Sequence, residues 1–404
     1  MLLLEEIQAL DDLELEGKRV FLRCDLDTPL SKEGRFAEPW RIESVASTVK
    51  KLQELGARVI VGSRFGEGRK KSDKSSSKGV ASIEPAAAYL SELLECEVLL
   101  PDGCVGDSLK KVLLDLKSNQ ICVLENLLNE EHEGQSAEAF ARKLNEYVDA
   151  YVGDSMRALA QGGATVIDLP SLVEFSAAGP QLLRELQAIA RIRSGIDTPR
   201  VIIWGGNSLS NRVDLLKRLA QHAQYVVLVG VAGNTMLHAL HGPLGTSKVE
   251  EEYLAGARTL FEQLGDKLIL PTDLVCAASP KAAAGIERHY SALHADEMAL
   301  DIGPQTRARI EELVQKAGTA IWCGSVGFQK SPTFAEGTLS LLSALKKTEG
   351  FTMVVGDDSV AAAHALGGDA LASIDCVAQG GQATLALLDE NKLLGLEALR
   401  GTNS

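Results

Sequence analysis

Short apolar runs rich in β-branched residues recur along the chain, and a segment with helical spacing follows most of them. Several runs are continuously apolar rather than alternating, which is typical of strands buried on both faces of a parallel sheet. The runs predict nine strands, at Arg19–Cys24, Arg58–Gly62, Ile121–Glu125, Ala150–Val152, Arg200–Trp204, Tyr225–Val229, Lys267–Leu270, Thr319–Cys323 and Thr352–Gly356.

The intervening segments have the spacing of amphipathic helices. Val45, Val49 and Leu52 fall at i, i+4 and i+7, and Gly56 offers a helix C-cap. Strand–helix alternation over the whole chain favours an α/β fold with right-handed crossovers. One sheet of ten or more strands is uncommon, so we predict two doubly wound parallel-sheet lobes.

The boundary between the lobes is expected near residues 182–198. Gln181–Arg193 has helical character, and the SGIDTP segment that follows it is a turn before the next strand. We therefore predict an N-terminal lobe at 1–180 completed by the tail 390–404, a hinge helix at 181–198, and a C-terminal lobe at 199–389.

Composition narrows the class of protein. The 404 residues suggest two or three domains at about 150 residues each, and 45% hydrophobic residues suffice for sizeable cores. The net charge of −14 argues against nucleic acid or an anionic membrane as the partner of the whole protein. No run is long enough to span a bilayer, and the acidic N-terminus does not resemble a signal peptide. A cytoplasmic protein is expected.

Cysteine and histidine patterns give no strong metal or disulfide signal. The seven cysteines are scattered without a CxxC pair, so we expect most of them to be small buried residues. His238 and His241 have the i, i+3 spacing that a metal site could use, but no third ligand is nearby in the sequence.

A basic low-complexity segment occupies residues 66–80. Between Arg69 and Lys78 it contains five cations and one aspartate. Such composition is typical of a solvated loop, and a docking patch for an anionic protein partner is the alternative.

Glycine-rich turns follow several predicted strands in the C-terminal half. Ligands of doubly wound sheets bind beyond the carboxyl ends of the strands, where glycine allows close backbone approach and helix N-termini attract phosphate. A ligand crevice is therefore predicted in this half. The turns are at Gly205–Arg212, Gly324–Phe328, Gly356–Ser359 and Gln379–Gln382.

An ordered series of motifs extends over essentially the whole chain. The series includes GKRVFLRCDLDTPLS at 17–31, LEN at 124–126, AYVGD at 150–154, WGGNSLSNRV at 204–213, LPTD at 270–273, ALDIGPQT at 299–306, WCGSVGF at 322–328, FAEGT at 334–338 and GDDSVAAA at 356–363. In order and spacing it resembles the phosphoglycerate kinase family. The resemblance implies a two-lobed hinge kinase that holds 3-phosphoglycerate in the N-terminal lobe and Mg-ADP or Mg-ATP in the C-terminal lobe.

Matching the N-terminal motifs residue by residue shows which family positions are kept. Asp25, Asp27, Arg41 and Arg64 fall in the substrate-binding positions, and Arg41 matches the arginine central to transfer. Asp27 replaces an asparagine, which adds a negative charge.

Three family arginines are replaced in this lobe. Their positions carry Glu67, Leu128 and, in a segment that is one residue shorter, Gln161. Arg64 or Arg157 could compensate from a different place.

The nucleotide-side motifs are altered in a similar way. The resemblance places cofactor contacts at Gly205, Gly206, Ser208, Arg212, Gly324, Gly356, Asp358 and Ser359. Ser208 stands at the position of the first catalytic lysine, and Arg212 at that of a second. Asp358 is the expected magnesium-side carboxylate, Asp357 replaces a glycine, and Lys330 replaces the ribose-contacting glutamate.

Three hypotheses about function follow. The first is an inactive or strongly impaired phosphoglycerate kinase homologue with a binding, scaffolding or regulatory role and weak Mg-ATP or Mg-ADP binding. The second is a working phosphoglycerate kinase with a rearranged site, and the third is a kinase with a changed substrate. Changes in both lobes favour the first, because one well-placed cation at a phosphoryl transition state is worth about 10³–10⁵ in rate.

Overall fold

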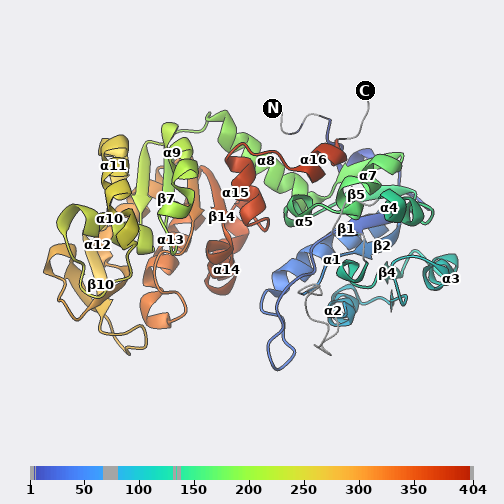
Figure 1. Cartoon of the computed structure of the whole chain (residues 1–404), viewed down its shortest axis with the longest axis horizontal. Helices are drawn as coiled ribbons and strands as arrows, with labels where there is room; N and C mark the ends of the chain where they lie inside the picture. Colours follow the sequence, from blue (N-terminus) through green and yellow to red (C-terminus); the bar gives the residue numbers. More distant parts are fainter. Residues whose placement is uncertain (1–3, 5, 67–80, 131–132, 134–137, 401–404) are drawn as a thin grey trace. The chain divides into compact units, whose positions relative to one another are not determined.

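The computed structural model describes residues 4, 6–66, 81–130, 133 and 138–400. The chain forms two compact units, which we call unit 1 (residues 1–187 and 391–404) and unit 2 (residues 188–390). The division at 187/188 lies within the segment expected to be a hinge helix, and the tail is grouped with unit 1. Figure 1 shows the elements of both units in sequence colours.

Unit 1 is built on a six-stranded parallel sheet with the order β3-β4-β2-β1-β5-β6. The four strands predicted here are present, with ends that differ by at most two residues. The two-residue β3 and the alanine-rich β6 were not predicted, because neither has a β-branched run. The strands are β1 (Arg19–Arg23), β2 (Arg58–Gly62), β3 (Val98–Leu99), β4 (Ile121–Val123), β5 (Ala150–Gly153) and β6 (Phe175–Ala178).

Helices complete unit 1 around this sheet. Val45, Val49 and Leu52 of α1 are buried against Val20 and Val59 of the sheet, as the helical spacing predicted. The C-terminal α16 contacts α5, α6 and α7. The helices are α1 (Pro39–Glu54), α2 (Glu84–Leu94), α3 (Asp107–Asp115), α4 (Glu138–Asn145), α5 (Met156–Gln161), α6 (Ala164–Ile167), α7 (Leu169–Leu172) and α16 (Leu394–Leu399), and α8 (Pro180–Ser194) leads into unit 2.

Unit 2 has a second six-stranded parallel sheet, with the order β15-β14-β13-β7-β8-β9. Its strands are β7 (Arg200–Trp204), β8 (Tyr225–Leu228), β9 (Leu268–Ile269), β13 (Thr319–Cys323), β14 (Phe351–Val355) and β15 (Cys376–Val377). Its helices are α9 (Val213–Gln221), α10 (Gly230–His241), α11 (Leu254–Leu264), α12 (Pro304–Gln315), α13 (Glu336–Lys346), α14 (Asp357–Leu366) and α15 (Gln382–Leu388).

A three-stranded antiparallel sheet of unit 2 was not predicted from the sequence, and neither was the two-residue β15. The antiparallel sheet has the order β11-β10-β12, with β10 (Asp273–Ala277), β11 (Ile286–His289) and β12 (Met298–Ile302). The edge strand β11 is largely exposed and polar, so it lacks the apolar run that marks a buried parallel strand. The prediction of parallel sheets alone was therefore incomplete.

Cysteine and membrane expectations can be compared with the structure directly. All seven cysteines are free thiols, and all but Cys96 are buried. No helix in the described part of the chain is long and apolar enough to span a bilayer.

A buried carboxylate in unit 1 holds the start of α8. Asp154 Oδ1 accepts hydrogen bonds from the backbone N–H groups of Gln181 (2.9 Å) and Leu182 (3.1 Å), and Oδ2 accepts one from the Thr48 hydroxyl. Burial raises the pKa of Asp154 to about 6, against the lowering effect of these hydrogen bonds. Asp154 therefore ties α8 to β5 and α1.

We predict that Asp154→Ala lowers the free energy of unfolding of unit 1 by about 2 kcal/mol, because a helix cap and a buried hydrogen bond are lost. Native-state hydrogen exchange of unit 1 peptides measures the change. Asp154→Asn is the matched control, since its amide can still accept from the backbone and donate to Thr48. An equal loss in both variants would contradict the capping role.

The same carboxyl gives a pH dependence with a defined sign. Its pKa is higher in the folded than in the unfolded chain, so its contribution to stability is complete below about pH 4 and is lost as the pH rises through about 6. The stability of the wild type relative to Asp154→Asn should therefore fall over this interval.

Candidate functional site

Two guanidinium groups in unit 1 share one carboxylate just beyond the end of β1. Asp25 Oδ2 lies 3.5 Å from Arg41 Nη1 and 3.4 Å from Arg157 Nε. Arg41 is only 3% exposed, and its Nε also donates to Glu38. Burial raises the pKa of Asp25, although both arginines oppose this. Arg41 and Arg157 are thus brought together, with internal carboxylates as their partners.

A second buried carboxylate engages two more arginines. Glu133 is 0% exposed, and its Oε1 lies 3.4 Å from Arg64 Nη2 and 4.0 Å from Arg23 Nη2. Thr165 donates to Glu133 through both its backbone N–H and its hydroxyl. Arg64 Nη2 also donates to the carbonyl oxygen of Gly162 at 2.6 Å. Burial, followed by the charge of Arg23, lowers the pKa of Arg64.

The other positions predicted in unit 1 have different surroundings. Asp27 Oδ1 accepts a hydrogen bond from Gly66 N at 2.8 Å. Arg64 Nη1 reaches Gln161 Oε1 at 3.5 Å, so a cation does lie beside that replaced family position. Leu128 lies in a short 3₁₀ turn, Leu127–Asn129. Glu67 and the basic segment at 67–80 lie outside the described residues.

In unit 2, the turns after β7, β13 and β14 line a crevice, which we call the glycine crevice. It brings together most of the predicted cofactor residues. Among the described residues that line it, Arg212 is the one cation, and Asp357 and Asp358 are both acidic. The predicted residues at its wall are Gly205, Gly206, Ser208, Arg212, Gly324, Gly356 and Asp358.

Close backbone packing explains two of these glycines without any ligand. A Cβ on Gly205 would lie 2.2 Å from the carbonyl oxygen of Ser325, and one on Gly324 would lie 2.5 Å from the carbonyl carbon of Gly205. Gly324 also has a positive φ of 86°. Glycine is therefore required for the two turns to touch each other, as well as to leave room for a ligand.

Ser359 connects two of the turns from beneath. Its buried hydroxyl accepts a hydrogen bond from Gly324 N at 3.2 Å and donates to the carbonyls of Val355 and Gly356. It is not among the residues that line the crevice, although a cofactor contact was predicted for it. Asp358 is exposed at the crevice, and the cap of α14 is Gly356 rather than Asp358.

Ser208 is bound to a carboxylate from a distant segment. Its hydroxyl donates to Glu250 Oε1 at 2.6 Å, and Glu250 also accepts from the backbone N–H groups of Leu209 and Ser210. Burial opposes ionisation of Glu250, but these hydrogen bonds outweigh it and lower its pKa. An internal anion thus occupies the polar groups of the turn at the position where the resemblance places a lysine.

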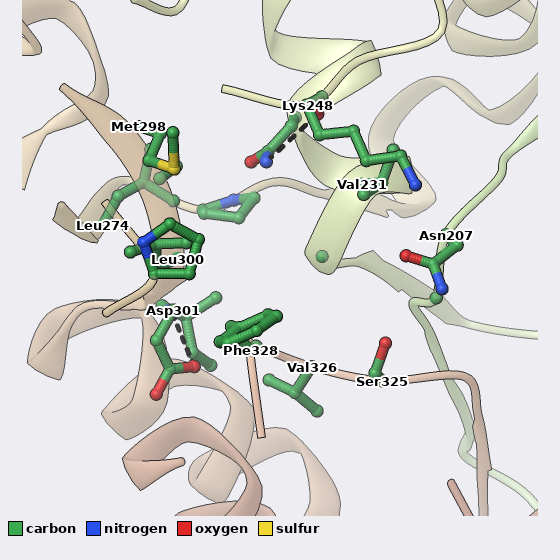
Figure 2. A pocket seen from close by; sticks show the side chains of 18 residues that line it. Asn207, Val231, Lys248, Leu274, Met298, Leu300, Asp301, Ser325, Val326 and Phe328 are labelled. Atoms are coloured by element: carbon green, nitrogen blue, oxygen red, sulfur yellow. Dashed lines mark hydrogen bonds between the residues drawn. The ribbon is translucent and has the colours of Figure 1, made fainter. Parts of the chain in front are cut away.

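An apolar pocket adjoins the glycine crevice. This apolar pocket has a volume of about 280 Å³, close to the lower end of the range of ligand sites. Figure 2 shows Phe328, Leu300 and Val326 around it. Gly206 and Asn207 line both cavities, so the apolar pocket and the glycine crevice are neighbours within unit 2, and we call the two together the groove.

Two charged residues of the apolar pocket were not predicted. Asp301 lies at one side, where its carboxylate accepts from the backbone N–H groups of Ile302 and Gly337, and burial raises its pKa to about 7. Lys248 is exposed, and its side chain runs past Val231 with the amine toward the Asn207 side (Figure 2). Lys248 comes from the loop after α10, where no motif marks it.

A metal site formed by the protein alone is not present in the described residues, since no three His, Cys, Asp or Glu side chains cluster there. His238 lies 3.9 Å from Glu251, and His241 packs against Tyr290. Asp357 and Asp358 offer carboxylate oxygens that could share a cation with a bound ligand.

Comparisons with known proteins identify the chain's relatives. Residues 10–391 match the family described as "Phosphoglycerate kinase". A protein named "Phosphoglycerate kinase" from Anaeromyxobacter sp. strain Fw109-5 is 33% identical over 399 residues, covering 98% of this chain and 100% of the relative. One of the same name from Salinispora tropica is 34% identical over 403 residues, covering 97% and 99%.

Solved structures agree with the predicted α/β fold. Phosphoglycerate kinase from Coxiella burnetii matches with a TM-score of 0.81 and 26% identity, covering 97% of this chain and 98% of that one. Phosphoglycerate kinase from Pyrococcus horikoshii OT3 gives the same TM-score and coverage at 23% identity, a likeness of fold alone. The predicted fold class is confirmed.

We predict that Glu133→Ala destabilises unit 1 by about 3–5 kcal/mol, because it leaves two arginines without their buried carboxylate. Urea-induced unfolding followed by circular dichroism measures this. Glu138→Ala is the matched control, since Glu138 is in an exposed i,i+4 pair with Arg142 worth about 0.3–0.5 kcal/mol. Similar losses in the two variants would contradict the role assigned to Glu133.

Proposed function

The chain belongs to the phosphoglycerate kinase family, and we propose that it binds a magnesium nucleotide in unit 2 while transferring phosphoryl groups slowly or not at all. Its role is then binding, scaffolding or regulation. The observation that carries this proposal is that Arg23, Arg41, Arg64 and Arg157 are all engaged by Asp25 or Glu133 within unit 1.

Nucleotide binding is supported by the two neighbouring cavities that make up the groove of unit 2. The apolar pocket suits a flat base beside Phe328, and the glycine crevice suits phosphate groups near the N-terminus of α14. The two meet at Gly206 and Asn207. Lys248 supplies a cation on the same side of the pocket as Asn207 (Figure 2).

Magnesium is implied by the family, and the residues present fit it. Asp358 and Asp357 line the crevice, and carboxylate oxygens are the ligands that Mg²⁺ prefers. Magnesium brought by a nucleotide neutralises phosphate charge. Without it, two aspartates against Arg212 would repel the phosphates, so binding is expected to require the divalent cation.

Slow transfer follows from the electrostatics of the remaining site. Phosphoryl transfer depends on cations placed around the transferred group, each worth about 10³–10⁵ in rate. The family lysine position is Ser208, which is bound to Glu250. Any anionic acceptor in unit 1 would compete with Asp25 and Glu133 for their arginines.

A working phosphoglycerate kinase, which transfers between ATP and 3-phosphoglycerate, is the second candidate. The comparisons favour it, since relatives of 33% and 34% identity over nearly the whole chain have that name. Arg64 beside Gln161 and Lys248 in the apolar pocket are cations that could replace the missing ones. No separate observation favours a changed acceptor, and a protein partner for the segment at 66–80 stays a prediction.

Restoring a cation tests the proposal. We predict that Ser208→Lys combined with Glu250→Gln raises kcat/KM for ATP and 3-phosphoglycerate at least about tenfold. A single cation at the developing charge can increase the rate by more than this, by about 10³–10⁵. A coupled transfer assay measures the rate. Ser210→Lys with Glu250→Gln is the matched control, because Ser210 contacts the same carboxylate but is off the family position.

Wild-type activity decides between the two candidates. Robust turnover by the wild type that disappears in Arg41→Ala would overturn the slow-transfer proposal and establish the working kinase. Tight Mg-ADP binding with little wild-type turnover supports the slow-transfer proposal, provided that the cation at position 208 increases the turnover.

Lys248 gives a separate prediction for binding. Lys248→Ala should weaken Mg-ADP binding about tenfold, the effect of losing roughly 1.4 kcal/mol from a charge-assisted contact. Isothermal titration calorimetry measures the dissociation constant. Lys316→Ala, at the residue that follows α12, is the control, because its amine pairs with Glu312 and it does not line the groove. Unchanged affinity in Lys248→Ala would remove this residue from the site.

A further inference from the structure

A second polar cavity of unit 2 lies at the amino ends of the sheet strands, whereas the glycine crevice lies at their carboxyl ends. Arg200 begins β7 and lines this cavity, whereas Trp204 ends β7 and lines the crevice. Its other walls come from the last turn of α8, from α9 and from the end of α15, all labelled in Figure 1. We call this cavity, of about 490 Å³, the basic pocket.

Arg200 is buried in the wall of the basic pocket with an unused donor. It is 1% exposed, and its Nη2 donates to the carbonyl oxygen of Ile192 at 2.7 Å. Its Nε has no hydrogen-bond partner among the described residues. An unsatisfied buried donor costs about 1–3 kcal/mol, and native proteins usually supply a water or an ion for it.

Cations outnumber carboxylates around this cavity. Arg193 lies 3.5 Å from Glu390, and Arg218 lies 3.9 Å from the same carboxylate and 2.9 Å from Asp389. Lys217 has no ion pair with any described residue. The lining therefore has four cations, Arg193, Arg200, Lys217 and Arg218, against Asp214 and Glu390.

Interactions with the C-terminal ends of helices explain only some of these cations. The carbonyl ends of α8 and α9 face the cavity region, and cations at such ends offset the helix dipole. Arg200 donates to the carbonyl oxygen of Ile192 at the end of α8, whereas the amine of Lys217 has no ion pair with any described residue. The excess positive charge and the size of the cavity favour a multivalent anion over a water or a chloride ion.

We propose that the basic pocket is a second anion site of this protein, which binds a small multivalent phosphate compound through Lys217, Arg193 and Arg200. Charge-assisted hydrogen bonds to phosphate oxygens satisfy the unused guanidinium and ammonium donors. The site is separate from the nucleotide groove and does not depend on the proposed function.

His222 provides a local reporter, since it is exposed and lines the same cavity. Histidine ring resonances of the full chain are followed by NMR during titration with inorganic phosphate, pyrophosphate or glycerol 2-phosphate. His222→Gln assigns the resonance among the seven histidines. We expect a saturable shift with a stronger response to pyrophosphate than to phosphate. A response to glycerol 2-phosphate, compared with inorganic phosphate, shows whether esters are accepted.

Variants tie the response to the proposed contacts. The double variant Lys217→Gln, Arg193→Gln should bind pyrophosphate at least about tenfold more weakly, and both side chains are accessible enough for folding to persist. Arg212→Gln, in the glycine crevice, should leave the His222 response unchanged. Circular dichroism checks that each variant is folded.

Two results would contradict the proposal that the basic pocket binds an anion. One is a His222 shift that sodium chloride reproduces at equal ionic strength or that survives in the double variant. The other is no response to millimolar pyrophosphate, which would assign the cations to the helix ends alone.

Discussion

In unit 1, buried and partly buried arginines pair with the carboxylates of Asp25 and Glu133, and this pairing organises the candidate site of that unit. Glu133 has no exposed surface and faces both Arg23 and Arg64, while Asp25 faces Arg41 and Arg157. Removing a charge from water is tolerable only when an opposite charge and hydrogen bonds replace the solvent. The same pairs that make the fold possible therefore reduce the positive charge that an anionic ligand would meet.

The anion site proposed for unit 2 is built differently. Its groove relies on backbone turns, a flat apolar wall and a few separate charges rather than on a cluster of arginines. Glu250 accepts hydrogen bonds from the turn at Ser208, so these donors are already used by the protein's own carboxylate. The remaining part would suit a ligand that brings its own counter-ion, as the proposed magnesium nucleotide does.

Features that depend on neighbouring residues could be predicted from the sequence, whereas contacts between distant residues could not. The apolar runs predicted β1, β2, β7 and β13 well, because strands buried on both faces have few alternatives. The edge strand β11 of the antiparallel sheet was missed because it is exposed and polar. Glycine turns could be placed at strand ends, but the partners of their side chains could not. Glu250 lies 42 positions from Ser208, and such pairings arise only when the whole unit is folded.

The hydroxyl of Ser359 has a consequence for how the groove responds to ligands. By joining the turn after β14 to the turn after β13, it makes the floor of the crevice one piece rather than two loops that adapt separately. Ligand binding then costs little conformational entropy for ordering that floor. Which ligands bind depends on whether their shape matches a fixed surface. Discrimination among ligands then depends on the periphery of the groove, where the side chains of Lys248 and Phe328 are exposed.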